Sequence, residues 1–572
     1  MLPAPASSPA GNDTMVTVTA QTGSGSCQSS LVTLANTVTI TFAAPASGTA
    51  GGCRLDDNLR VRVLDAASGG PLAGAYVMVG GWEGDIFEPD FENVLAGSAT
   101  APNTGRTDAH GYLEFTDHGS ALLGPLMVTA GLEGYGYTSY ADSDAADLVL
   151  YLEPIATPPA TATIEGQVTG LPVVTRDGWL DAAMVMNQLG LDSLVRFRFD
   201  DLLAQEKDCW LAANIPLIGD QWAEMPTNVY VPGQVERYII FNITVNEHRY
   251  TTVPLELGAS DQHIVALAGQ VPWSDVVDLM LNGGSLAGIV PLLEVQRIGL
   301  IQRASIGGDE TDVPIDAGTT LDANAGCQLS DKHPSLAGSD DLCLALGDWT
   351  GGQGSGPMFI MGFKQLAGGT GTVTTVADSG PYAGIGYLGF GVSAYLDSST
   401  LPPGDEWKSA ATSGVLDRSG NLGPGGGSLD FGQLLGITPL LLSGAATYQW
   451  NDVSYSSSTV ELTEHALELL DTSTYSIGSN CGDITVVTNR STLWKVYTPG
   501  GTTSFTLPTL PAGWPRAADG GLASPGADQL LHWSFAAYHL GLLAGGFDFD
   551  AGDISTLLDW VTHTSTNGLD LP

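Results

Sequence analysis

Strict alternation of apolar and polar residues is the feature that most constrains how this chain can fold. Between Leu59 and Leu152, successive short runs alternate with a period of two, and Gly, Pro or Asp residues separate them. A β-strand places neighbouring side chains on opposite faces of a sheet, so this period indicates half-buried strands rather than helices. The 74 glycines and 32 prolines of the 572-residue chain also favour many turns and short strands. We therefore predict a mainly β protein.

One part of the alternating region carries a recognisable combination of residues. It contains a Pro-Leu-Ala-Gly-Ala-x-Val run (71–77), a Thr-Asp-Ala-x-Gly turn (107–111) and a Val-Thr-Ala-x-x-x-Gly-Tyr strand (128–135). These motifs resemble those of a carboxypeptidase regulatory-like (transthyretin-like) β-sandwich domain. The resemblance implies an N-terminal β-sandwich of the Ig/transthyretin type over residues 56–153. It also implies an accessory module that has no active site of its own.

Composition shifts divide the chain into a tail, two N-terminal β segments, a linker and a large remainder. The clearest boundary is the run Pro-Ile-Ala-Thr-Pro-Pro-Ala-Thr-Ala, which is typical of an extended linker. The remainder is expected to be β-rich, as one domain or two subdomains, with a few helices, and its polar stretch 307–356 is expected to be a long loop. The predicted segments are a flexible tail (1–14), a leading β segment (15–55), the β-sandwich (56–153), the Pro-rich linker (154–162), the large β-rich region (163–572) and C-terminal helices at 526–543 and 553–562.

The charge of the chain excludes some classes of partner. Only 19 Lys and Arg residues accompany 62 Asp and Glu residues, which gives a formal net charge of −43. Nucleic acids and anionic membrane surfaces require basic patches, so we expect neither as a partner. The acidity either serves a function or is a habit of the source proteome. We also find no run of 18 apolar residues, and therefore expect no transmembrane segment.

The N-terminus and the cysteines bear on the compartment. The first nine residues lack the charged start and apolar centre of a signal peptide, so we interpret the chain as mature, with its signal segment already removed. This predicts an extracellular or cell-surface protein, with the periplasm, or a cytoplasmic protein without any signal, as alternatives. The six cysteines contain no Cys-x-x-Cys pair, which disfavours zinc and redox motifs and favours three disulfides over six buried thiols. The pairs we prefer are Cys27–Cys53 and Cys327–Cys343, which close short Gly-rich loops. The third pair, Cys209–Cys481, consists of the two cysteines that are then left.

Two acidic clusters are candidate metal sites. Calcium takes six to eight oxygen ligands, which carboxylate-rich loops can supply. Neither cluster has the spacing of the twelve-residue calcium loop, and a solvated acidic loop is the alternative for both. Calcium is the only cofactor that the sequence suggests. The candidate ligands are Glu83, Asp85, Glu88, Asp90 and Glu92 in an insertion between two sandwich strands, and Asp548, Asp550 and Asp553 near the C-terminus.

No catalytic motif is evident. The stretch Gly283–Gly288 lacks a glycine that the Gly-x-Ser-x-Gly elbow of serine hydrolases requires, and Ser355 lies between glycines in an expected loop. The nine histidines include no His-Glu-x-x-His pair. His532 and His539 lie seven residues apart in the predicted C-terminal helix, where roughly the same face would carry both. We interpret them as core or interface residues, and we identify no catalytic residue.

Our leading hypothesis is a secreted or cell-surface structural or binding protein without catalytic activity. Its partners would be other surface proteins or glycans, because Trp and Tyr rings stack on pyranoses while Asp and Asn bind hydroxyls. One alternative is a carrier of an apolar ligand, with a pocket in region 163–572 lined by the apolar runs 289–293, 434–442 and 530–543. Another is a secreted hydrolase with calcium-supported loops and dispersed active residues.

Overall fold

The computed structural model describes most of the chain beyond residue 57, together with two short strands before it. The described residues are 15–20, 27–32, 58–81, 104–116, 126–143, 145, 147–155, 159–198, 202–238, 241–276, 290–349, 356–396, 401–420, 428–444, 446–541 and 560–571.

The chain forms two compact units, and each takes segments from separate parts of the sequence. Unit 1 consists of Met1–Pro154, Trp494–Leu522 and Leu542–Ile554. Unit 2 consists of Ile155–Leu493, Ala523–Gly541 and Ser555–Pro572. The first division falls at the start of the expected Pro-rich linker. The return of residues 494–522 to unit 1 has no counterpart in the predicted domain organisation, which placed them in the large C-terminal region.

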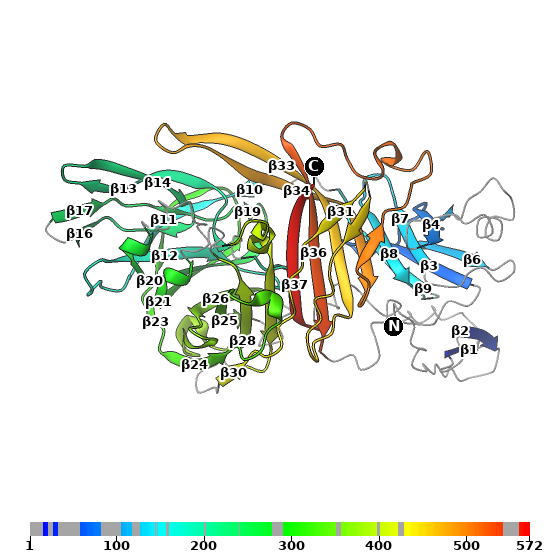
Figure 1. Ribbon diagram of the computed structural model, residues 1–572, viewed down its shortest axis with the longest axis horizontal. Coiled ribbons are helices and arrows are strands. Elements are labelled where there is room, and N and C mark those ends of the chain that lie inside the picture. Colours follow the sequence, from blue (N-terminus) through cyan, green and yellow to red (C-terminus); the bar gives the residue numbers. More distant parts are fainter. Residues whose placement is uncertain are drawn as a thin grey trace, which may run out of the picture. The chain divides into compact units, whose positions relative to one another are not determined.

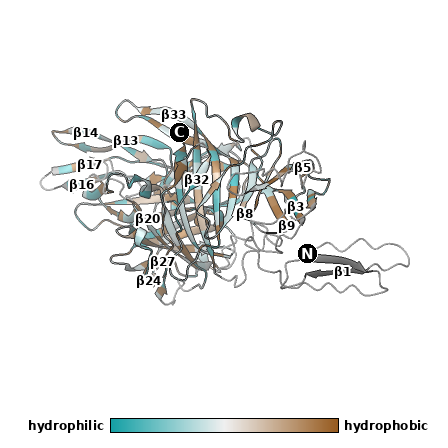
Figure 2. Cartoon of the chain, turned by 45° about the vertical axis from the view of Figure 1, so that its right-hand side comes forward, coloured by the Kyte–Doolittle hydropathy of each residue, from teal (hydrophilic) through white to brown (hydrophobic). Residues whose placement is uncertain are grey.

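The structure confirms that the protein is mainly β. Its helices are the single α-helix turn α2 (Leu191–Val195), a turn at 273–276 and a few 3-10 turns, none of which has the length that a lipid bilayer requires. Hydrophobic residues, drawn in brown in Figure 2, are interspersed with polar ones along the strands. The named 3-10 turns are η3 (Pro334–Leu336), η4 (Gly380–Tyr382), η6 (Glu406–Ala410) and η7 (Ala517–Asp519).

Unit 1 contains a β-sandwich. One sheet has the order β6 (Tyr112–Thr116), β3 (Asn58–Asp65), β9 (Asp147–Leu152), with β3 and β9 parallel. The second has the order β5 (Thr104–Arg106), β4 (Tyr76–Gly81), β7 (Leu126–Gly131), β8 (Tyr137–Ser143). Hydrogen bonds from Thr138 Oγ1 and Tyr140 Oη of β8 to backbone carbonyls of β9 join the two sheets. The unit also holds the hairpin of β1 (Met15–Ala20) and β2 (Cys27–Val32), and β35 (Ser504–Thr506).

The returning segment completes the second sheet of this sandwich. Strand β34 (Gly482–Pro499) begins in unit 2, and its residues 494–497 pair in parallel with β8 in unit 1. Trp494 is fully buried, donates from its indole nitrogen to Ser139 Oγ (2.8 Å) and packs against the ring of Tyr137 at 4.8 Å. Trp514, which also belongs to the returning segment, stacks on Tyr137 with 6.3 Å between the ring centroids. The aromatic core of unit 1 is therefore assembled from residues more than 350 positions apart, such as Ser139 and Trp494.

Unit 2 is built from several sheets, and two of them enclose one hydrophobic core. Ala183, Val185, Ile264, Ala266 and other apolar residues of this core are at most 6% exposed. The first enclosing sheet has the order β15 (Val229–Tyr230), β12 (Trp179–Asn187), β20 (Ser260–Pro272), β21 (Glu294–Ser305), β23 (Thr319–Thr320). The second has the order β18 (Tyr250–Thr251), β11 (Ile164–Thr169), β22 (Glu310–Asp316).

The remaining strands of unit 2 include a long sheet in which β36 and β37 run side by side (Figure 1). Its order within the unit is β26 (Met358–Gln365), β25 (Asp340–Asp348), β28 (Gly386–Ala394), β29 (Thr412–Asp417), β37 (Val561–Leu571), β36 (Gln529–Leu540), β33 (Leu462–Gly478) and the first part of β34. A further sheet has the order β14 (Gly219–Pro226), β13 (Lys207–Ile215), β17 (Phe241–Val245), β16 (Gln234–Tyr238). A three-stranded sheet has the order β27 (Thr370–Thr375), β24 (Ala323–Gln328), β30 (Ser428–Asp430). Two more strand pairs are β10 (Thr161–Ala162) with β19 (Leu255–Glu256), and β31 (Leu441–Ser443) with β32 (Thr447–Gln449).

Two predictions about local structure are wrong. The expected helix 526–543 is the strand β36, which pairs with β33 on one side and β37 on the other. A central strand that is buried on both faces has a nearly continuous apolar sequence, which periodicity alone cannot distinguish from a buried helix. The described end of the second expected helix, 553–562, leads into strand β37, and its earlier residues lie outside the described part. The expected loop 307–356 contains β22, β23, β24 and β25.

Candidate functional site

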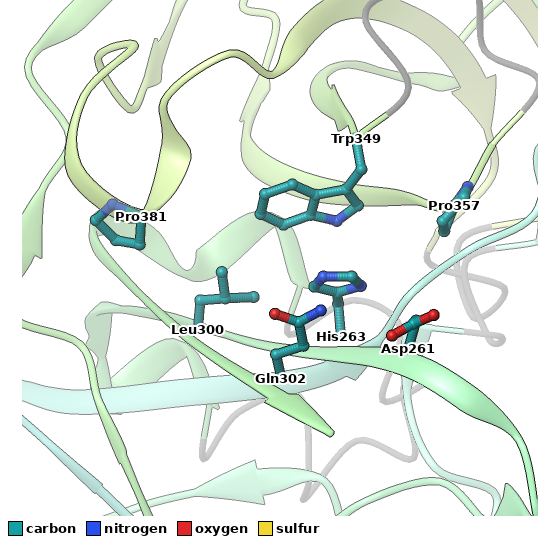
Figure 3. A pocket seen from close by; sticks show the side chains of 7 residues that line it. All are labelled: Asp261, His263, Leu300, Gln302, Trp349, Pro357 and Pro381. Atoms are coloured by element: carbon teal, nitrogen blue, oxygen red, sulfur yellow. The ribbon is translucent and has the colours of Figure 1, made fainter. Parts of the chain in front are cut away.

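The candidate site is a cavity of about 670 Å³ in unit 2 (Figure 3). Its floor comes from the antiparallel pair β20 and β21, in which His263 and Gln302 are direct cross-strand partners. Residues opposite each other in an antiparallel pair project from the same face, so both side chains reach the same space. The other walls come from the end of β25, the start of β26 and the turn η4. The lining residues are Asp261, His263, Leu300, Gln302, Trp349, Pro357 and Pro381.

A stack of aromatic rings fixes one wall of the cavity. The Trp349 ring stacks on the His263 ring at 4.5 Å and on Phe359 at 4.9 Å, and Tyr382 packs against Phe359 at 6.3 Å. In Figure 3 the five-membered ring of Trp349 lies over His263, whereas its six-membered ring extends toward Pro381. Such stacked contacts contribute beyond the area they bury and hold the rings in place. The indole is therefore presented to the cavity in a fixed orientation.

The hydrogen bonds of His263 define the tautomer of its neutral ring. Gln188 Oε1 accepts from the backbone N–H of His263 and lies 3.1 Å from the ring Nδ1. An amide oxygen only accepts, so Nδ1 carries the proton and Nε2 is the acceptor nitrogen of the ring. Burial lowers the pKa of His263, which keeps the imidazole neutral at pH 7. The ring thus adds no positive charge to the cavity.

Asp261 is the one charged residue in the described part of the lining. It is exposed and has φ = 50°, in the left-handed region that residues other than Gly rarely occupy. Backbone strain of this kind persists where the surrounding structure enforces it, and it is enriched at functional sites. The described lining residues include no Lys or Arg. They therefore combine one carboxylate with neutral polar and apolar groups.

The described lining offers groups that can bind a ligand. Among the seven residues described there, none is a Ser, Thr or Cys that could act as a nucleophile, and none adds a second carboxylate that could pair with Asp261 in acid–base work. Among the described residues, no group of three or more His, Cys, Asp or Glu side chains is placed to hold a metal ion. What the cavity offers is an aromatic edge, aliphatic walls and hydrogen-bonding groups.

A second cluster brings a serine and a histidine together without forming a catalytic triad. Ser458 Oγ lies 3.4 Å from Nε2 of His563, and burial lowers the pKa of His563 to about 4. The other ring nitrogen meets the Thr562 hydroxyl at 2.9 Å, where a triad needs a carboxylate. His539 lies next to His563, and Glu461 holds it at 3.1 Å and raises its pKa. These groups are occupied with each other.

The histidines that were expected on one helical face are separated by the strand. His532 and His539 are an odd number of residues apart on β36, so they point to opposite faces. His532 Nδ1 lies 2.7 Å from Asp570 Oδ1, while His539 meets Glu461. Neither residue lines the candidate cavity, which agrees with their interpretation as packed residues.

The described residues form two disulfides. Cys209–Cys481 joins β13 to the residues between β33 and β34, with 5.7 Å between the Cα atoms. Cys327–Cys343 joins β24 to β25, with 6.4 Å between the Cα atoms. These are two of the three pairs preferred from the sequence. The side chains of the third, Cys27 and Cys53, lie outside the described part of the chain.

The candidate calcium ligands also lie outside the described residues, and calcium therefore stays a prediction. They belong to the stretches 82–103 and 542–559. They are Glu83, Asp85, Glu88, Asp90 and Glu92, and Asp548, Asp550 and Asp553.

The cavity shares no residue with the apolar runs expected to line a carrier pocket. Leu434, Leu435 and Leu440 are buried as ordinary core, and 530–540 lie in β36. Sequence reasoning also missed every residue of the cavity. The register that pairs His263 with Gln302 and the left-handed conformation of Asp261 leave no sequence motif. The one usable signal is at Trp349, where a large aromatic residue directly precedes a Gly-rich stretch.

Comparisons with known proteins do not place the chain in a family. No family model and no curated protein matches it. Solved structures with some likeness include the TIE protein of Bacillus anthracis (8% identity, 67% of this chain and 51% of that chain, TM-score 0.12). Others are a streptococcal ancillary pilin (12%, 50% and 70%, 0.13) and the shaft pilin of Lactobacillus rhamnosus GG (9%, 46% and 97%, 0.12). TM-scores this low carry no functional assignment, so this chain's own residues are the basis for its function.

Proposed function

We propose that the protein is an extracellular or cell-surface structural or binding protein without catalytic activity. The observation that carries this proposal is the pair of disulfides, Cys209–Cys481 and Cys327–Cys343. Disulfides persist in oxidising compartments and are rare where glutathione and thioredoxin keep thiols reduced. All four of these cysteines lie in unit 2, and the described residues contain no free thiol.

The ionisable groups of unit 2 support a structural role. Arg196 pairs with the buried carboxylate of Glu464, and Arg490 pairs with Glu468 at 2.7 Å. His465 is fully buried, and burial lowers its pKa to about 3, so it is neutral. A catalytic group needs a pKa near the working pH and access to substrate. The two carboxylates are instead paired with the two arginines, and the ring of His465 contacts Thr463 Oγ1 and the Trp533 indole nitrogen.

Unit 1 fits the same proposal as a non-catalytic module. Its parallel β3–β9 pair and its second sheet form a sandwich that carries the motifs resembling a carboxypeptidase regulatory-like domain. In this proposal the sandwich acts as a spacer or support. Other surface proteins and glycans are the partners that the proposal includes.

The test is the redox state and the location of the native protein. Cells are treated with a membrane-impermeant thiol reagent before lysis, and peptides are then mapped without reduction. We expect the peptides containing Cys209 and Cys481 to appear crosslinked, and the protein to be accessible to protease added to intact cells. Six alkylatable thiols in protein recovered from the cytosolic fraction would contradict the proposal.

A further inference from the structure

We propose that the cavity at Asp261, His263, Gln302 and Trp349 binds a neutral saccharide ring. The proposal deepens the proposed function, which includes glycans among the partners, and it rests on that function in this respect. The glycoside titration and the test of redox state and location can fail separately, because the first probes the cavity and the second probes the compartment. The proposal rests on the hydrogen-bonding inventory of the lining, on the placement of the indole and on the charge of the chain.

The polar groups select the class of ligand. The Asp261 carboxylate and the His263 Nε2 accept hydrogen bonds, while the Gln302 amide both donates and accepts. Hydroxyl groups also donate and accept, so they can match this mixed set. An ammonium ion only donates and would leave the Gln302 NH2 group unmatched. A wholly apolar ligand would leave all three groups without partners, which costs free energy.

Charge disfavours anionic ligands. A phosphate or carboxylate would meet Asp261, find no Lys or Arg in the lining and approach a chain with a formal net charge of −43. A neutral polyhydroxylated ring meets no such penalty. The exposed carboxylate can instead accept from a hydroxyl, as a charge-assisted hydrogen bond.

The apolar walls suit the C–H face of a sugar ring. Figure 3 shows the six-membered ring of Trp349 directed toward Pro381, with Leu300 beneath it. These three side chains line the cavity together with Gln302. The cavity volume of about 670 Å³ lies within the range of small-ligand sites. Because His263 and Phe359 hold the indole in place, little side-chain freedom is lost when a ring binds.

The strained Asp261 gives the proposal a distinctive signature. A glycine accepts φ = 50° without cost, so Asp261→Gly is expected to stabilise the fold slightly while it removes a ligand contact. A residue that served only the fold would not show gain of stability with loss of binding. Asp312 has φ = 58°, is exposed and lies outside the cavity, so Asp312→Gly is the control for binding. Because Asp312 also pairs with Arg249, the stability comparison uses Ser456→Gly, at an exposed residue with φ = 55°.

The experiment titrates the full-length protein with a panel of neutral methyl glycosides, using ligand-observed saturation-transfer NMR. We expect at least one glycoside to bind through its ring C–H protons. Gln302→Leu and Asp261→Gly should each weaken that binding about tenfold, as expected for the loss of one hydrogen bond. Trp349→Ala should abolish it, whereas Trp222→Ala, at an exposed indole on β14, and Asp312→Gly should leave it unchanged.

Two further probes keep the inference falsifiable. Butylammonium chloride and inorganic phosphate are titrated under the same conditions, and circular dichroism confirms that each variant is folded. Salt-sensitive binding of butylammonium without glycoside binding would overturn the saccharide assignment in favour of a cationic ligand. Glycoside binding that survives in both Gln302→Leu and Asp261→Gly would show that the site lies elsewhere. No binding by any glycoside would also refute the proposal.

Discussion

Removal of the Cys209–Cys481 disulfide is expected to destabilise unit 2 more than removal of Cys327–Cys343. The two pairs are separated by 272 and 16 residues in the sequence. In the chain-entropy model a crosslink restricts the unfolded chain, and its effect is a constant of about 0.6 kcal/mol plus 1.5RT ln n, where n is the loop length. At 25 °C this gives about 5.6 kcal/mol for the longer loop and about 3.1 kcal/mol for the shorter one. The expected gap is about 2.5 kcal/mol.

Packing acts in the opposite direction and reduces this gap. Cys327 and Cys343 are 3% and 0% exposed, whereas Cys209 and Cys481 are only partly buried. Replacing the buried pair with Ala leaves unfilled space in the core, at a cost of about 1 kcal/mol or more. The expected difference between the two double-Ala variants is therefore about 1 kcal/mol, with the Cys209→Ala, Cys481→Ala protein the less stable.

The assay is unfolding in guanidinium chloride at 25 °C, followed by tryptophan fluorescence and by circular dichroism. Coincident transitions by the two probes are required before a free energy of unfolding is assigned. Equal or reversed stabilities of the two variants would refute the loop-length reasoning and would indicate that packing around the sulfur atoms dominates. Mild reduction of the folded protein gives a second readout, since the less buried Cys209–Cys481 pair should open first.

Three further predictions concern the interior of unit 2. Arg196→Met should cost about 2–3 kcal/mol of unfolding free energy in chemical denaturation, because it leaves the buried Glu464 carboxylate without its cation. The cost stays below that of a fully buried pair, because Arg196 is 38% exposed and Glu464 keeps the Tyr538 hydroxyl as a donor, and the double variant with Glu464→Leu should recover part of the loss. The folded-state pKa of His563 is depressed to about 4, so its contribution to stability is present above the unfolded pKa of about 6.5 and is lost as pH falls. Between pH 8 and 5 the free energy of unfolding should fall by about 2 kcal/mol for this reason. The variant His563→Gln should flatten the measured pH dependence by that amount. Gly166→Ala should cost about 3 kcal/mol or more of stability, because the new Cβ would lie 1.8 Å from a backbone oxygen of β22. Gly178→Ala should cost about 1 kcal/mol, because open space surrounds its Cβ and only its φ of +81° is unfavourable. Thermal melting of the two variants tests the comparison.

Local patterns predicted the class of fold but not how its pieces associate. Alternation predicted the strands of the sandwich, and β3 and β9 lie within the expected runs. Alternation requires one wet and one dry face, so it could not identify β36, which is buried between β33 and β37. The same limit explains the misassigned C-terminal helix. Where both faces of a strand are buried, its sequence indicates burial but does not reveal the two-residue period.

The candidate cavity was beyond sequence reasoning for a different reason. His263 and Gln302 meet only because β20 and β21 pair in one register, and Trp349 arrives from a strand of another sheet. A shift of one residue in that register would turn Gln302 to the opposite face. The local sequence around each residue is unremarkable. Their proximity is a property of the sheet arrangement.

The C-terminal return into unit 1 shows how non-local pairing changes the meaning of a domain boundary. The linker at 154–162 suggested that residues 56–153 would be complete by themselves, yet β8 pairs with residues 494–497 of β34. Both ends of the returning segment meet at Trp494. A Cβ on Gly521 would lie 2.3 Å from the Trp494 ring, so glycine at position 521 lets the segment fold back onto its own indole. Without this segment the Tyr137 ring and the Ser139 hydroxyl would lose buried partners. The sandwich is therefore a composite of two distant segments, and its stability depends on residues that follow most of unit 2 in the chain.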